Sequence, residues 1–442
     1  MAHLHEIPSI EENFEFNPAH KTKLLIAIAV GVAMVAVGAF LLHKGWSIGV
    51  WETAEGHGGA GPEHGGTHGE DHHGATLMSR IVGNIWMNSV YFLGISLIGA
   101  FFMSYNYVAK AGWYTSIKRI PEAFPAFMVI PAAILLVLYL IPATRHIVFH
   151  WTHEGIMTPG SEIYDEIIAQ KEWYLNFWFF LIRIVVYFVI WFVLWKQIRK
   201  YSLLEDQYND LEHYHSSRKY AKMFLMFFAV TSSTAAWDLS MSIDTHWFST
   251  MFGWYHLASW HVSGLAAIML AILLLKDQGY LKAVNDSVLH DLGKLIFGFS
   301  VFWAYVWFSQ YLLIFYANLP EETIYFRERI SGFDGRYFAP FLISLVLNFV
   351  FPFLVMMARG SKRNYMLLKL ACGAILVGHW FDFYQMLMPG IAKEQGGIGL
   401  IEWGTTLVFA SAFILVIANQ LKKANLIPKH HPFIGESLNH NI

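Results

Sequence analysis

Apolar residues gather in ten long runs along the chain, and short polar stretches separate these runs. Each run is close to the length of about 20 residues that a helix needs to cross the hydrocarbon core of a bilayer. A lone strand at that depth would leave its backbone groups unpaired, so we expect every run to be helical. The predicted spans are residues 24–44, 83–109, 124–144, 173–197, 220–238, 252–275, 291–317, 337–357, 366–388 and 399–421. The pattern predicts an all-α polytopic membrane protein with ten transmembrane helices.

The distribution of Lys and Arg predicts how these helices are oriented. Ten spans place both termini on one side, and that side carries 21 of the 30 Lys and Arg residues, against 8 on the other side and Arg183 within a span. Because Lys and Arg favour the cytoplasmic side, we expect both termini in the cytoplasm. The chain then divides into a cytoplasmic segment 1–23, a membrane domain 24–421 with an outer loop 45–80, and a cytoplasmic tail 422–442.

Composition agrees with a membrane protein and limits its chemistry. The chain is 56% hydrophobic and only 14% charged, whereas soluble domains carry about 25% charged residues. A net charge of −2 argues against a nucleic-acid partner. The only cysteine, Cys372, cannot form an internal disulfide or hold an iron–sulfur cluster. The outer loop is rich in Gly and carries His57, His64, His68, His72 and His73, which leaves a loosely bound metal open.

Ionisable side chains at bilayer depth are costly, so each one is a candidate functional residue. Thr231, Thr234 and Asp238 share one face of the fifth span. They form a polar stripe that either carries protons or bonds back to its own helix. His379 and Asp382 are three residues apart on the ninth span, and a histidine beside a carboxylate suits a proton relay. The remaining candidates at this depth are His256, His261 and Glu402.

These groups lie mostly in the outer half of the membrane, and the inner half is expected to offer mainly Ser, Thr and Trp. A proton path across the whole membrane would then need chains of water in the inner half. His256 and His261 point about 140° apart on their helix, so they serve one site only if neighbours lie on both sides. A haem held by two histidines would need a facing pair at matched depth, for which His379 is the available partner.

The stretch SIDTHWFSTMFGWY, residues 242–255, follows the span that ends in Asp238 and precedes a span rich in His. The chain resembles an integral membrane component of bacterial alternative complex III, a quinol:cytochrome c oxidoreductase, in the NrfD/polysulfide-reductase-C-like family. The resemblance implies two four-helix bundles, spans 2–5 and 6–9, with spans 1 and 10 peripheral, in the bacterial inner membrane. It points to Asp238, Asp244, His246, His379 and Asp382 for the proton path, whereas His256, His261 and Glu402 rest on depth and chemistry alone.

The resemblance also implies that this chain holds no redox cofactor. Haem c and iron–sulfur clusters are expected in partner subunits, and quinol in a sister subunit. The expected partners are an NrfD-like quinol-binding subunit, multihaem cytochrome c and iron–sulfur subunits, with a terminal oxidase as a further candidate. The expected function is that of a non-catalytic membrane subunit of a respiratory quinol:electron-acceptor oxidoreductase, which conducts or couples protons and supports assembly.

Two other functions fit the same residues. A quinol-binding membrane anchor would use Asp244 and His246 to take up quinol protons near the outer face. An ion-coupled transporter would need helices interrupted by Gly or Pro at matched positions, and the prolines of the spans are not arranged in that way. If Asp238 and Asp382 carry protons, we expect their asparagine variants to assemble and to turn over more slowly.

Overall fold

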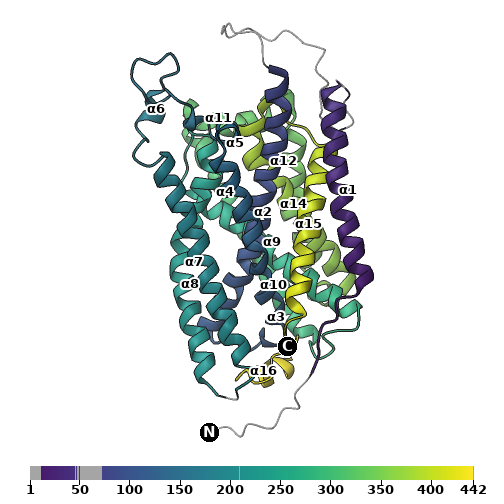
Figure 1. The fold of residues 1–442 in the computed structure, drawn as a ribbon. Helices are drawn as coiled ribbons and strands as arrows, with labels where there is room; N and C mark the ends of the chain where they lie inside the picture. The colour runs from purple at the N-terminus through teal and green to yellow at the C-terminus, as the bar shows by residue number, and fades with distance from the viewer. Residues whose placement is uncertain (1–10, 45, 47–48, 50–71, 209, 442) are drawn as a thin grey trace.

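The computed structural model describes residues 11–44, 46, 49, 72–208 and 210–441. The predicted loop histidines His57, His64 and His68 lie outside these residues. Eight long helices dominate the described part of the chain. They are α1 (Pro18–His43), α2 (His72–Ala109), α7 (Phe177–Leu204), α8 (Glu212–Leu239), α9 (Met251–Asp277), α10 (Asp286–Ala317), α14 (Tyr365–Ala392) and α15 (Leu400–Leu421). They stand side by side and give the molecule the form of an upright bundle (Figure 1).

Shorter helices complete the bundle. Two crossings are built from consecutive pieces, namely η1 (Thr115–Ile117), α3 (Arg119–Ala123), η2 (Phe124–Met128) and α4 (Val129–Leu140), and then α12 (Phe338–Leu345), the π-helical turn η6 (Val346–Val350) and α13 (Phe351–Met356). The connections contain α5 (Pro142–Val148), η3 (His150–Thr152), α6 (Glu166–Ala169), η4 (Met241–Ile243), α11 (Pro320–Ile330), η5 (Phe333–Gly335), η7 (Ser361–Arg363) and η8 (Lys393–Gln395). The tail carries α16 (Ile434–Leu438).

Nine of these helical segments in the described part of the chain are long and apolar enough to cross a membrane. The chain is therefore a polytopic helical membrane protein, as its apolar runs predict. Each of the ten predicted spans coincides with a helix or with a run of consecutive helices. The one that falls outside the nine is α8, which is 28 residues long but begins with the polar stretch EHYHSSRKYAK.

Asparagine side chains begin four of the long helices. Asn17, Asn176, Asn285 and Asn364 each accept a hydrogen bond from a backbone N–H in the first turn of α1, α7, α10 and α14. Such an N-cap provides a partner for a donor that has none within the helix. These residues therefore define helix starts that the apolar pattern alone leaves imprecise.

The third crossing differs most from its prediction. The predicted range is 124–144, but the segment begins at Thr115 and ends at Leu140. Its first turns contain Lys118 and Arg119, whose charges are typical of a loop. The early end has a local cause, because the proline ring of Pro142 disfavours helical geometry in the residue before it, and Ile141 is extended, with φ −78° and ψ 117°.

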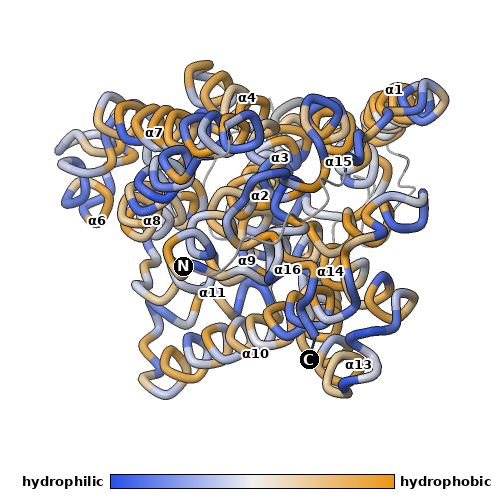
Figure 2. The backbone as a smooth tube through the Cα atoms, turned by 90° about the horizontal axis from the view of Figure 1, so that it is seen from below, coloured by the Kyte–Doolittle hydropathy of each residue, from blue (hydrophilic) through white to orange (hydrophobic). Residues whose placement is uncertain are grey.

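The helix α2 lies at the centre of the bundle. It packs against η2, α4, α8, α9, α14 and α15, and almost every residue from Val82 to Ala100 is buried. Seen along the bundle axis, α1 lies at the edge of the molecule beside α15 (Figure 2). Small residues allow that contact, since a Cβ atom on Gly31 would lie 2.7 Å from the carbonyl oxygen of Gly404. Close approach at glycine is a common way for membrane helices to associate.

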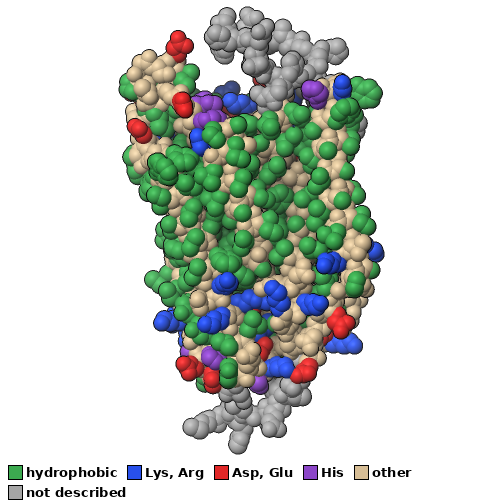
Figure 3. Space-filling view, viewed as in Figure 1, with side chains coloured by type: hydrophobic (Ala, Val, Ile, Leu, Met, Phe, Trp, Pro, Cys, Tyr) green, Lys and Arg blue, Asp and Glu red, His purple; other side chains and the backbone are tan. Residues whose placement is uncertain are grey.

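The described parts of the N-terminal and C-terminal segments meet at one end of the bundle. Asn13 forms a β-bridge with Asn425, and the Leu426 amide donates to the Glu12 carbonyl at 2.9 Å. The tail then packs against the chain's own helices, with Ser437 Oγ 2.8 Å from Ser116 Oγ. Lys and Arg side chains gather in a band near this lower end, below a broad apolar surface (Figure 3). We call it the terminal end and call the opposite one the far end.

Candidate functional site

The buried carboxylate of Asp382 lies at the centre of a polar cluster formed by α9, α10 and α14. On α9 the hydroxyls of Tyr255 and Ser259 donate to it, the second at 2.7 Å. Trp303 Nε1 on α10 donates to Oδ2 at 3.0 Å, and Nδ1 of His379 lies 3.3 Å from the same oxygen. All five side chains are buried. The expected contact between His379 and Asp382 is present, and three neutral donors accompany it.

Within the described chain, the side chains that hydrogen-bond to Asp382 are three neutral donors and one histidine. An arginine or lysine would favour the ionised carboxylate through a permanent positive charge. His379 is charged only when it is protonated. The two side chains can therefore share one proton, which is the chemistry that a proton relay needs.

Asp238 is instead held in a buried ion pair with Arg183 of α7. Nη2 and Nε of the guanidinium donate to the two carboxylate oxygens at 2.8 and 3.0 Å, and the Tyr187 hydroxyl donates at 3.1 Å. The guanidinium also lies 3.7 Å from the centre of the Tyr174 ring. Bidentate pairing of this kind is strong and geometrically specific. It ties α7 to α8 and leaves Asp238 beside a permanent cation.

The hydroxyls of the expected polar stripe bond to their own helix. Thr231 Oγ1 donates to the carbonyl one turn earlier at 2.8 Å and accepts from Trp191 Nε1 at 2.9 Å. Thr234 Oγ1 lies 3.3 Å from the carbonyl of Thr231. In the described chain no side-chain hydrogen bond joins either threonine to Asp238. These contacts favour the back-bonding alternative over a continuous stripe.

The two candidates in the turn between α8 and α9, Asp244 and His246, bind different parts of the molecule. Asp244 accepts from Arg329 Nη2 of α11 at 2.8 Å. His246 Nε2 lies 2.6 Å from the carboxylate of Asp165, in the loop before α6. The His246 side chain is 52% exposed, whereas that of Asp244 is 17% exposed. The two side chains therefore do not converge on one ligand.

Glu402, at the far end of α15, is paired with Arg80 of α2. Nε and Nη2 of the guanidinium donate to the two carboxylate oxygens at 2.7 and 2.6 Å, and Asn84 Nδ2 donates at 2.8 Å. The backbone N–H of Gly399 donates to the same carboxylate at 2.8 Å and so caps the start of α15. Arg80 belongs to α2, whereas the sequence places it in the outer loop.

His256 and His261 occupy separate aromatic surroundings. Nε2 of His256 lies 3.0 Å from Ser240 Oγ, and its ring packs 4.3 Å from that of Trp260. The His261 ring lies 4.2 Å from Phe299 and 5.2 Å from Phe101, and neither of its nitrogens has a hydrogen-bond partner within the described chain. No group of three or more potential metal ligands occurs among the described residues, and neither ring contacts another histidine there.

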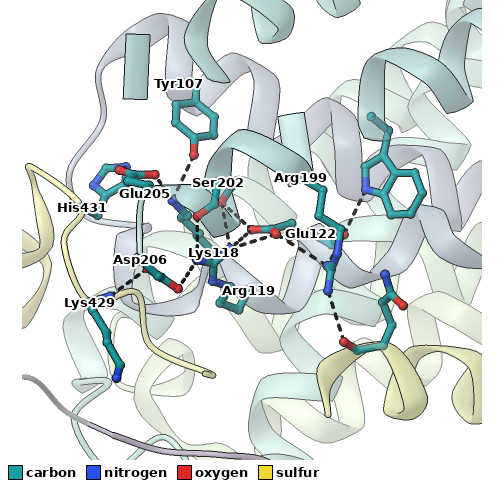
Figure 4. Close-up of polar contacts among 12 residues, drawn as sticks. Tyr107, Lys118, Arg119, Glu122, Arg199, Ser202, Glu205, Asp206, Lys429 and His431 are labelled. Carbon is teal, nitrogen blue, oxygen red and sulfur yellow. Dashed lines mark hydrogen bonds and ion pairs between the residues drawn. The ribbon is translucent and has the colours of Figure 1, made fainter. Parts of the chain in front are cut away.

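A second set of buried charges lies at the terminal end, where the sequence predicts mainly Ser, Thr and Trp (Figure 4). Lys118 Nζ pairs with Glu205 at 2.9 Å, and Arg119 pairs with Glu122 at 2.8 Å and also with Asp206. These ion pairs, together with Arg199 on Glu122 at 3.6 Å, join α3 to the end of α7. The terminal end thus holds buried titratable groups as well, because the charged start of the third crossing folds into the bundle.

The tail closes this ionic cluster. The Lys429 amide donates to Asp206 Oδ1 at 3.0 Å, and His431 Nε2 lies 3.8 Å from Glu205 Oε1. Burial raises the pKa of Glu205, although the neighbouring Lys118 opposes the shift. Burial, together with the charges of Lys118 and Arg119, lowers the pKa of His431 well below its ordinary value. His431 is thus a neutral, buried side chain packed between the tail and the membrane domain.

Comparison with known proteins finds no family model and no curated protein that matches the chain. The chemistry of the buried groups is therefore the main guide to its function.

Proposed function

We propose that the chain is an integral membrane subunit of a respiratory quinol:electron-acceptor oxidoreductase of the alternative complex III type. In this proposal it holds no redox cofactor, and its own contribution is proton conduction or coupling together with assembly of the complex. Haem c and iron–sulfur clusters belong to partner subunits, quinol binds a sister subunit, and a terminal oxidase is a further partner. The membrane is the bacterial inner membrane.

The proposed topology has ten spans, namely the nine long apolar segments together with α8. Two rings of contacts support a division into two four-helix bundles. The first ring joins α2, α4, α7 and α8, and the second joins α9, α10, the α12–α13 segment and α14. The helices α1 and α15 then form a peripheral pair. A cytoplasmic terminal end is supported by the band of Lys and Arg side chains there, because these residues favour the cytoplasmic side (Figure 3).

The observation that carries the proton proposal is the environment of Asp382. The carboxyl is buried, three neutral donors bind it, and His379 is beside it on the next turn of α14. A carboxyl that exchanges protons must be stable in both forms. Hydroxyl groups suit both forms, because a hydroxyl can donate to a carboxylate and accept from a carboxylic acid.

The test compares Asp382→Asn with wild-type protein in the purified complex, reconstituted in liposomes. Quinol oxidation and proton release are measured together. We expect the variant to assemble and to lose proton-coupled turnover by about 10²-fold, a loss typical of removing a positioned proton-transfer group. Asp277→Asn is the matched control, because Asp277 is 47% exposed and pairs with Lys369 at the terminal end.

Unchanged turnover and proton release in Asp382→Asn would mean that the cluster is structural. A chain that purifies without haem-containing or iron–sulfur partners would instead overturn its assignment as a respiratory subunit. A third outcome, loss of quinol oxidation together with loss of quinone binding to this chain, would replace proton coupling by the role of a quinol anchor.

A further inference from the structure

A long apolar groove of about 590 Å³ runs along α15, between the peripheral pair and the body of the protein. Its lining residues on α15 extend from Trp403 to Leu421, a rise of about 27 Å at 1.5 Å per residue. A groove of this length and apolar lining can hold an extended hydrocarbon chain.

The lining of the groove is mostly apolar. It includes small side chains, namely Ala267 and Ala271 on α9 and Ala410 and Ala418 on α15. Within the described chain the lining contains no Asp or Glu. Such a surface accepts an apolar chain and does not repel an anion at either end.

Toward the far end of the bundle, the groove offers few free hydrogen-bonding groups. Trp380 Nε1 and Thr406 Oγ1 lie there, and both are 3.2 Å from Asn88 Oδ1. Because these donors already share an acceptor within the protein, they are not free to bind a polar head group. This end therefore offers little to a polar head group.

The other end of the groove is cationic. His20 and Lys23, both exposed on the first turns of α1, line the groove there. Phe14 and Phe16 form its floor, and this segment is fixed by a hydrogen bond of 2.6 Å from the Leu281 amide to the carboxylate of Glu12. The positive groups lie at the terminal end, where they can pair with an anionic head group.

We propose that the groove binds one anionic glycerophospholipid, with an acyl chain along α15 and its phosphate at Lys23 and His20. The acyl chain itself gives little selectivity among lipids, because all lipid tails are as apolar as the groove. Selection must come from the head group, and a basic residue near the membrane surface favours an anionic lipid about fivefold. The lipid is expected whether or not the protein belongs to a respiratory complex.

The test uses the full-length chain, purified in detergent and supplied with phosphatidylglycerol or phosphatidylcholine that carry the same acyl chains. Native mass spectrometry counts the lipids that remain bound. We expect one tightly held phosphatidylglycerol, and a preference over phosphatidylcholine that falls about fivefold in Lys23→Gln. Lys21→Gln is the matched control, since Lys21 lies on the same turn of α1 but does not line the groove.

A second pair of variants tests the binding of the acyl chain separately from that of the head group. Ala410→Phe fills the groove and is expected to abolish lipid retention, whereas Ala29→Phe adds the same ring to an exposed position of α1 outside the groove. Thermal unfolding shows whether both variants fold. The proposal is overturned if the two lipids are retained equally by the wild type, if Ala410→Phe folds and keeps its lipid, or if an isoprenoid quinone or a protein segment occupies the groove instead.

Discussion

Replacing Asp238 by Asn tests whether its pair with Arg183 holds the membrane domain together. The variant leaves the guanidinium, whose side chain is 9% exposed, opposite a neutral amide. The carbonyl of Tyr174, at 2.9 Å, is then its remaining strong acceptor. Breaking a buried ion pair by removing one charge costs about 3–5 kcal/mol, because the other charge stays buried without a partner. We expect the free energy of unfolding to fall by that amount, although the sequence alone predicts a variant that assembles normally.

The measurement is equilibrium unfolding in mixed micelles, followed by tryptophan fluorescence. The double variant Arg183→Met/Asp238→Leu removes both charges, and it should recover most of the loss, since apolar replacement of a buried pair is often neutral. Asp382→Asn is the matched single change without a cationic partner, with an expected loss of about 1–3 kcal/mol. The reasoning is refuted if Asp238→Asn unfolds like the wild type, or if the double variant is no more stable than the single one.

The docked tail and the turn between α8 and α9 provide two further predictions. Burial lowers the pKa of His431 when the tail is docked. As the pH falls below about 6.5, His431 is therefore protonated in the undocked tail but stays neutral in the docked tail. Docking is therefore strongest above that pH. Hydrogen exchange of residues 424–441 should show more opening at pH 5.5 than at pH 7.5. A His431→Gln variant that keeps this pH dependence would contradict the role given to His431. The His246→Gln variant should change the free energy of unfolding by less than about 1 kcal/mol, because its pair with Asp165 is half exposed. Quinol oxidation by the complex should also be unchanged in that variant, and a large loss of activity would favour the quinol anchor.

The helices could be predicted because their cause is local. A run of about 20 apolar residues has few alternatives in a bilayer, and residues such as Asn17 and Asn364 begin a helix through their own side chains. The third crossing is where this reasoning fails. Lys118 and Arg119 read as a loop because their partners, Glu205 and Asp206, lie 87 residues away in the chain.

The candidate site was predictable only in part, for the same reason. His379 and Asp382 are neighbours on one helix, so their contact follows from helix geometry. The arginine partners of the other carboxylates are separated from them by 55 residues for Asp238, 85 for Asp244 and 322 for Glu402. The sequence did contain one sign of these pairs. Arg183 lies within an apolar span, and a charge at that depth requires a partner.

The kind of partner, rather than depth in the membrane, distinguishes the four candidate carboxylates. Asp238, Asp244 and Glu402 each face an arginine, whose charge is permanent, and their pairs join α7 to α8, the turn between α8 and α9 to α11, and α2 to α15. A group that must take up and release a proton in each cycle would work against such a cation. Asp382 faces neutral donors and a titratable histidine. Three carboxylates thus hold helices in place, and one is left whose surroundings allow the exchange of a proton.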